Sequence, residues 1–231
     1  MGAGSFIQVI KTSNMPYIPT GLKNLLIIMA LFGLAQIALP RVGFDVMELY
    51  LYYPDSQWFR PWQLITHVFC HGGFTHFLFN AIALFSFGAV VEFRLGTSKF
   101  LQLFLLSALG AVLLHFGNVA VQLYADLGTI FPNRAHGEFM YHYGPMVGAS
   151  GAVYGVMVAF AMMYPNESLM FLFIPYPIKA KYLVSFMIIL DLVLAFGNLE
   201  GDIVAHFAHL GGALVGLIFT IFWKRSGFKA W

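Results

Sequence analysis

The sequence predicts an all-α polytopic membrane protein, a bundle of six transmembrane helices with both termini in the cytoplasm. Hydrophobic residues make up 60% of the 231 residues and charged residues only 10%, whereas soluble domains have about 45–50% and about 25%. Six segments come close to the roughly 20 mostly apolar residues that a membrane-spanning helix needs. The basic residues also fall mainly in loops on one side of these segments, as the positive-inside rule expects.

The apolar segments are helices rather than barrel strands, because none alternates apolar and polar residues over barrel length. Two of them have a proline as a stop signal: Pro40 follows the first and Pro165 follows the fourth. The predicted spans are residues 22–39, 74–91, 100–121, 147–164, 182–196 and 203–223.

Loop charges predict the orientation. With the N-terminus inside, only Arg41, Arg60 and Arg134 fall outside. The other Lys and Arg residues fall inside: Lys11, Lys23, Arg94, Lys99, Lys179, Lys181, Lys224, Arg225 and Lys229. We therefore expect a cytoplasmic N-terminal segment 1–21, a membrane domain 22–223 and a short basic cytoplasmic tail 224–231.

The composition also excludes some classes of function. The net charge of +2 is too small to indicate a nucleic-acid partner. The single Cys70 rules out an intrachain disulfide and a multi-cysteine metal site. The outer loop 40–63 is aromatic and amphipathic, with Trp58 and Trp62, which suits a segment lying in the membrane interface.

Ser150 lies about three residues into the fourth segment, among small residues. Gly148, Gly151 and Gly155 surround it. Small residues at this spacing pack membrane helices closely, so packing alone explains the serine. A serine at a helix N-terminus also lies where the helix dipole favours negative charge, so it could act as a nucleophile and help hold an oxyanion. Ser150 alone favours packing.

His209 lies near the start of the sixth segment, at a depth similar to that of Ser150. Gly212 and Gly216 follow at a spacing that lets two helices approach closely. A serine becomes a useful nucleophile beside a base, and histidine is the usual base. A lone intramembrane histidine can equally be a structural residue held by hydrogen bonds. His206 lies one turn above His209 and has no assigned role.

His76 and Asn80 lie four residues apart and so share one face of the second segment. Both fall in the outer half, below the Gly72-Gly73 pair. An imidazole or amide N–H can stabilise a developing oxyanion. Helix–helix hydrogen bonding is the alternative for this pair taken alone.

The other polar residues carry weaker signals. His67, His71 and His76 suggest a metal site, because His67 and His71 have the i, i+4 spacing of zinc-binding helices. This evidence is weak, since no Glu lies nearby and two glycines follow His71. We expect no metal here. His115 and Asp191 are interpreted as structural polar contacts. Asp202 lies nearer to His206 than to His209, so a working serine and histidine are expected to form a dyad without a carboxylate.

Taken together, these residues resemble the rhomboid family of intramembrane serine proteases over residues 58 to 223. One motif alone is weak, but four of them in order are specific. The four are His76-x-x-x-Asn80, Glu92-Phe93-Arg94-Leu95-Gly96, Gly148-Ala149-Ser150-Gly151 with Tyr154, and Ala208-His209-Leu210-Gly211-Gly212 with Gly216.

The resemblance implies a six-helix rhomboid-like bundle around a water-filled cavity that opens to the outside. It implies Ser150 as nucleophile and His209 as base and acid. His76, Asn80 and the Ser150 N–H would form the oxyanion hole, and Tyr154 would pack against the imidazole. Gly148, Gly151, Gly212 and Gly216 are assigned to helix packing.

The implied activity is serine endopeptidase cleavage of transmembrane protein substrates within the lipid bilayer. The resemblance implies no cofactor, metal or nucleic acid. The protein would be a multi-pass protein of the plasma (inner) membrane if prokaryotic, with the active site facing the non-cytoplasmic side.

Two other functions remain as alternatives. A catalytically inactive relative binds membrane clients without cutting them, but such relatives typically lack the serine or the histidine. A histidine-lined metal or solute transporter predicts inverted repeats and interrupted helices, and the sequence has neither. One departure from the family is Trp62-Gln63, where many members have Trp-Arg. It puts the anchoring of the 40–63 loop in doubt.

Overall fold

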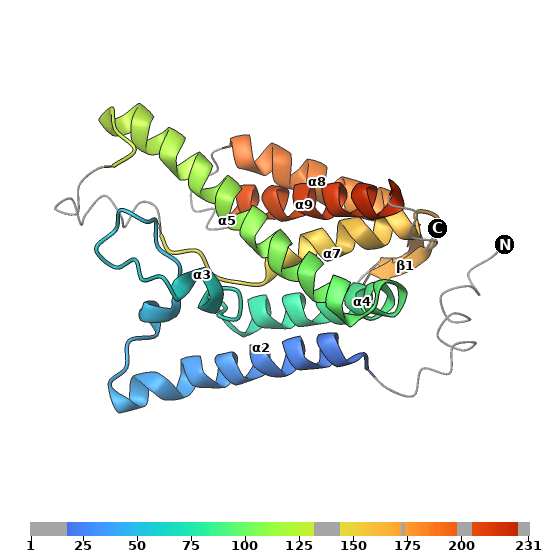
Figure 1. The fold of residues 1–231 in the computed structure, drawn as a ribbon, viewed down its shortest axis with the longest axis horizontal. Helices are drawn as coiled ribbons and strands as arrows, with labels where there is room; N and C mark the ends of the chain where they lie inside the picture. Colours follow the sequence, from blue (N-terminus) through green and yellow to red (C-terminus); the bar gives the residue numbers. More distant parts are fainter. Residues whose placement is uncertain (1–17, 132–143, 172–173, 198–204, 226–231) are drawn as a thin grey trace.

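The computed structural model describes residues 18–131, 144–171, 174–197 and 205–225. Its helices lie side by side as a bundle (Figure 1). In chain order the main helices are α2 (Thr20–Ala38), α4 (Phe74–Leu95), α5 (Thr97–Leu127), α7 (Ser150–Met163), α8 (Ala180–Gly197) and α9 (His206–Arg225). The shorter elements are η1 (Leu39–Val42), η2 (Val46–Leu49), α3 (Gln63–Thr66), β1 (Ser168–Phe171) and β2 (Ile174–Lys179).

Five of the described helices are long and apolar enough to cross a membrane. They are α2 with η1, α4, α5, α8 and α9. The prediction of a sixth full span at 147–164 is not confirmed, because α7 has only 14 residues. At 1.5 Å per residue it reaches about 21 Å, which is shorter than the roughly 30 Å hydrocarbon core. Figure 1 shows α7 beginning in the middle of the bundle.

The central helices α5, α7 and α9 touch backbone to backbone at glycines. A Cβ at Gly212 would overlap the carbonyl oxygen of Gly151, and one at Gly216 would overlap that of Gly155. A Cβ at Gly110 of α5 would overlap the Val215 side chain of α9. Helices associate this closely in membranes only where side chains are absent from the contact.

The start of α2 and the end of α9 lie at the same end of the bundle (Figure 1). The predicted inside charges of the described residues fall at this end because α4 ends at Leu95 and α8 begins at Ala180. The prediction that both termini are cytoplasmic concerns residues 1–17 and 226–231, which lie outside the described part.

A two-stranded antiparallel hairpin, β1–β2, joins α7 to α8 at that same end (Figure 1). Ser168 pairs with Lys179 and Leu169 with Ile178. The sequence does not predict this hairpin, because strands of four and six residues are too short to show an alternating pattern of barrel length.

The loop between α2 and α4 is anchored by Gln63, which is fully buried in α3. Its Oε1 accepts from the backbone N–H of Arg60 at 3.0 Å, and its Nε2 donates to the carbonyl of Trp58 at 2.9 Å. Nε2 also donates to the carbonyl of Glu48 at 3.3 Å. Trp62-Gln63 therefore ties the loop together without the arginine that many members carry here.

Glu92 joins the beginning of α2 to the end of α4. Its carboxylate accepts hydrogen bonds from the backbone N–H groups of Gly21 at 2.8 Å and Leu22 at 2.6 Å. The Thr97 hydroxyl donates a third at 2.7 Å. The first N–H groups of a helix have no partner within it, so this buried carboxylate caps α2 from another helix.

Candidate active site

Ser150 is the first residue of α7 and lies inside the bundle. The chain reaches it through residues 144–149, which are held by the α2–α4 loop. Met146 and Leu51 exchange backbone hydrogen bonds of 2.8 and 3.0 Å, and the Gly148 N–H donates to the His67 carbonyl at 2.9 Å. Gly148 has a φ of +114°, a conformation that glycine adopts readily. That turn begins α7 three residues later than the predicted span.

His209 contacts Ser150 directly. Its Nε2 lies 2.8 Å from the Ser150 Oγ. The imidazole stacks on the Tyr154 ring, with centroids 4.5 Å apart and planes 8° from parallel. Gly212, one turn beyond His209, lies against Gly151, so the absence of side chains at this contact lets α9 come near enough for the hydrogen bond.

Asp191 of α8 supplies a carboxylate to the site, in contrast to the predicted dyad. Its Oδ1 lies 2.9 Å from the His209 Nδ1 and 2.5 Å from the His206 Nδ1. Asp191 is only 3% exposed. One of its polar contacts is therefore with the imidazole that contacts Ser150. Asp202 lies outside the described residues.

This arrangement fixes which ring nitrogen of His209 carries the proton. A carboxylate oxygen only accepts, so His209 donates from Nδ1–H to Asp191. Its Nε2 then presents a lone pair, which accepts from the Ser150 hydroxyl. A serine, an imidazole and an orienting acid in this order form an activated nucleophile.

His76 and Asn80 lie on α4, and His76 is packed against the turn before Ser150. A Cβ at Gly148 would come within 2.8 Å of the His76 Nε2. The Gly72 N–H donates to His76 Nδ1 at 3.3 Å. The buried Asn80 donates one amide hydrogen to the His76 carbonyl at 2.9 Å. An amide group carries two hydrogens, so Asn80 can donate the second one to another acceptor.

The histidines of the α2–α4 loop are neutral and separately bonded. His67 Nδ1 lies 2.6 Å from the Gln63 carbonyl, and His71 Nδ1 lies 3.1 Å from the Phe69 carbonyl. Burial lowers the pKa of each imidazole to about 4. In the described part of the chain, His, Cys, Asp and Glu ligand atoms gather at metal-binding distances at Asp191, His206 and His209. The predicted candidates His67, His71 and His76 do not form such a group there.

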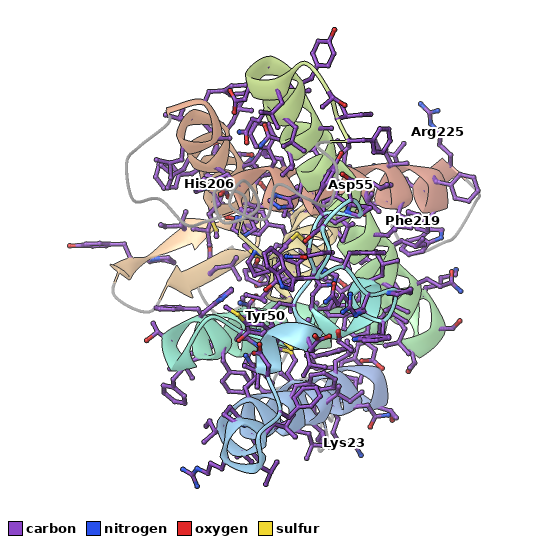
Figure 2. All side chains as sticks on the ribbon, turned by 90° about the vertical axis from the view of Figure 1, so that its left-hand side faces the viewer. Lys23, Tyr50, Asp55, His206, Phe219 and Arg225 are labelled. Atoms are coloured by element: carbon purple, nitrogen blue, oxygen red, sulfur yellow. The ribbon has the colours of Figure 1, made fainter. Side chains whose placement is uncertain are left out.

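A small cavity lies beside Ser150, between α5, α7 and the start of α9. Its lining includes His67, Ala108, Ala111, Met146, Gly151 and Ala208. The loop between α2 and α4 lies at the end of the bundle that faces the viewer in Figure 2, where Tyr50 and Asp55 are labelled. Ser150 lies close to this loop, because the Gly148 N–H, two residues before it, donates to the His67 carbonyl.

Residues 58–226 match the sequence profile of the Rhomboid domain, which is most of the chain. The chain belongs to the rhomboid family. With its apolar helices, this rhomboid is a multi-pass integral membrane protein.

Its relatives include mitochondrial and bacterial rhomboids. It is 28% identical over 208 residues to Rhomboid protein 1, mitochondrial, of Saccharomyces cerevisiae, covering 88% of this chain and 54% of that protein. An uncharacterized mitochondrial rhomboid protein of Schizosaccharomyces pombe is 29% identical, and the match covers 72% of this chain and 52% of that protein's length. Rhomboid protease GlpG of Pectobacterium atrosepticum is 28% identical over 95% of this chain and 66% of its own.

The chain spans about half the length of the two mitochondrial relatives.

Asp191 is the residue of the site that the sequence prediction missed. An acidic residue in an otherwise apolar helix is itself a signal, because such groups are costly in a membrane and usually face a functional interior.

Proposed function

We propose that this rhomboid is a serine endopeptidase that hydrolyses a peptide bond in or near a transmembrane segment of a substrate protein. The observation that carries the proposal is the contact of 2.8 Å between Ser150 Oγ and His209 Nε2, with Nδ1 held by Asp191. One of the relatives above, GlpG, is named a rhomboid protease, which supports the same chemistry.

His209 acts as the general base and then as the general acid. Its Nε2 takes the proton from Ser150 as Oγ attacks the substrate carbonyl carbon. The protonated imidazole then gives this proton to the leaving amine, and an acyl-enzyme remains. A water molecule attacks the ester, with His209 again as base, and releases the new carboxyl end and free Ser150. No cofactor enters these steps.

Asp191 orients the imidazole and stabilises its charged form, so the reacting unit is a triad rather than the predicted dyad. Tyr154 limits the rotation of the imidazole by stacking on it. The backbone N–H of Ser150 has no partner within α7, because it belongs to the first turn. Together with His76 and Asn80 it serves as the donor set for the oxyanion.

The active site faces the non-cytoplasmic side. The basic residues at the opposite end of the bundle support this orientation through the positive-inside rule. In a prokaryote the membrane is the plasma (inner) membrane, whereas the mitochondrial relatives make an organelle membrane the alternative. A C-terminal fluorescent fusion and a C-terminal alkaline phosphatase fusion test the orientation, because fluorescence without phosphatase activity is expected if the C-terminus is cytoplasmic.

The test is covalent labelling of the purified protein in detergent with a fluorophosphonate or isocoumarin probe, together with cleavage of a transmembrane substrate. Ser150→Ala should abolish both, and His209→Ala should do the same. The matched control is Ser107→Ala, which removes a fully buried hydroxyl elsewhere in the same bundle. Labelling that persists in Ser150→Ala while Ser107→Ala loses it would contradict the assignment.

Asn80→Ala separates the oxyanion hole from the nucleophile. Removing one oxyanion donor lowers kcat by about 10²–10³-fold in a serine protease. We expect slow cleavage with an unchanged thermal unfolding midpoint. A normal cleavage rate in this variant would remove Asn80 from the donor set.

A further inference from the structure

The cluster of Asp191, His206 and His209 contains one residue for which the proposed reaction has no use. His206 is the first residue of α9 and is 8% exposed. It lies three residues before His209, so both imidazoles project from one face of the helix. Both direct Nδ1 at the same oxygen of Asp191. A triad needs only one of these imidazoles.

Two imidazoles and one carboxylate also form a ligand set for a transition cation. Zn²⁺ takes this set with bonds of about 2.0–2.2 Å and keeps a further position for water. In a tetrahedral site the ligand atoms are about 3.3 Å apart. The ligand atoms of the three residues all lie within 4.8 Å of one another. Side-chain shifts of about 1 Å therefore convert the hydrogen-bonded cluster into a coordination sphere.

The Asp191 carboxylate has coordinating capacity to spare. Its Oδ2 is buried and has no hydrogen-bond partner within the described residues. The Tyr154 hydroxyl also interacts with this carboxylate. A buried carboxylate oxygen without a donor is costly, and a cation would satisfy it.

We propose that Asp191, His206 and His209 bind a divalent transition cation of the Zn²⁺ class, and that the bound cation switches off Ser150. The binding stands on the cluster itself, and only the inhibition rests on the proposed function. A metal on Nδ1 of His209 leaves the single proton of the neutral imidazole on Nε2. The proton on Nδ1 of His209 moves to Nε2, so the imidazole neither gains nor loses a proton. Nε2 then donates toward Ser150 and cannot accept its proton.

The first experiment measures binding without any reference to activity. Metal-free protein in detergent is titrated with Co²⁺, whose visible absorption reports tetrahedral coordination, and Zn²⁺ is then added to displace it. We expect a Co²⁺ band in the wild type and its loss in His206→Asn. Asn keeps an N–H donor for Asp191 but is a poor zinc ligand. His115→Asn, on α5, is the matched control and should keep the band.

The second experiment measures inhibition. The rate of probe labelling is recorded with and without Zn²⁺ in each variant, so that differences in basal activity cancel in the ratio. We expect inhibition that EDTA reverses, and a shift to at least about 10-fold higher Zn²⁺ in His206→Asn, since even the loss of a residue supporting a ligand costs 10–100-fold in affinity. Mg²⁺, which prefers oxygen ligands, should not inhibit.

The outcomes separate the two ideas. Absence of a Co²⁺ band in the wild type, or an equal band in His206→Asn, overturns the metal site whatever the activity. A Co²⁺ band that depends on His206 in a protein that no serine probe labels supports the site and overturns the proposed protease function. Zn²⁺ inhibition of equal strength in His206→Asn and the wild type places the inhibiting ion elsewhere and overturns the switch.

Discussion

Replacing Asp191 by Asn tests whether the carboxylate belongs to the reacting unit. The change keeps the shape of the side chain but removes its charge and one acceptor. If the Asn oxygen faces the histidines, His209 loses a charge-assisted hydrogen bond worth about 1.5–3 kcal/mol. That corresponds to a fall of about 10- to 150-fold in kcat.

If instead the amide nitrogen faces the histidines, it donates to Nδ1 and forces the proton of His209 onto Nε2. The base then points a proton at Ser150 over the same 2.8 Å contact. The equivalent change in chymotrypsin-type proteases lowers kcat by about 10⁴-fold for this reason. The expected loss for Asp191→Asn is therefore between about 10- and 10⁴-fold.

The assay is cleavage of a transmembrane substrate by purified protein in detergent, with kcat and KM measured separately. A loss confined to kcat is expected, because Asp191 acts on the imidazole rather than on substrate. Glu92→Gln is the matched control, since it neutralises another buried carboxylate that contacts α2 instead of the site. Unchanged kcat in a folded Asp191→Asn protein would refute the triad and restore the dyad.

Three further predictions concern stability, each measured as unfolding in detergent. Gly148→Ala should lower the unfolding midpoint and the labelling of Ser150, because φ is +114° and a Cβ would lie 2.7 Å from His76 Cε1. Glu92→Gln should lower the free energy of unfolding by about 2–4 kcal/mol, since three charge-assisted hydrogen bonds weaken, with normal kcat per folded molecule. Burial holds the pKa of His67, outside the membrane-spanning segments, at about 4 against 6.5, so the unfolded chain takes up the proton first and stability should fall as pH drops from 6.5 to 4. His67→Gln should flatten that pH dependence, and an unchanged slope would contradict it.

The sequence was sufficient to predict the apolar helices, because the thickness and apolar character of the lipid bilayer set their length and composition. Predicted bounds such as 74–91 and 182–196 lie within α4 and α8. The structure extends most helices by a few residues, since polar ends such as Arg94 and Lys99 still take helical backbone. Those residues are ordinary helix formers, and hydropathy marks only where the lipid ends.

The beginning of α7 could not be predicted from hydropathy. Val147 and Ala149 are as apolar as the helix that follows. What ends the loop is a tertiary constraint: the Gly148 N–H is bonded to His67, and the turn there needs a positive φ. The same constraint places Ser150 at the helix N-terminus, where its own N–H has no partner within the helix.

Asp191 illustrates a different limit. Its neighbours in the sequence are apolar, and its partners are 15 and 18 residues away on another helix. Which face of α8 meets α9 depends on packing, so the sequence shows an intramembrane acid without showing what it touches. The packing brings the Nδ1 atoms of His206 and His209 to one oxygen of Asp191, and only His209 also contacts Ser150. His206 is therefore the residue whose removal should abolish metal binding without removing the proposed base.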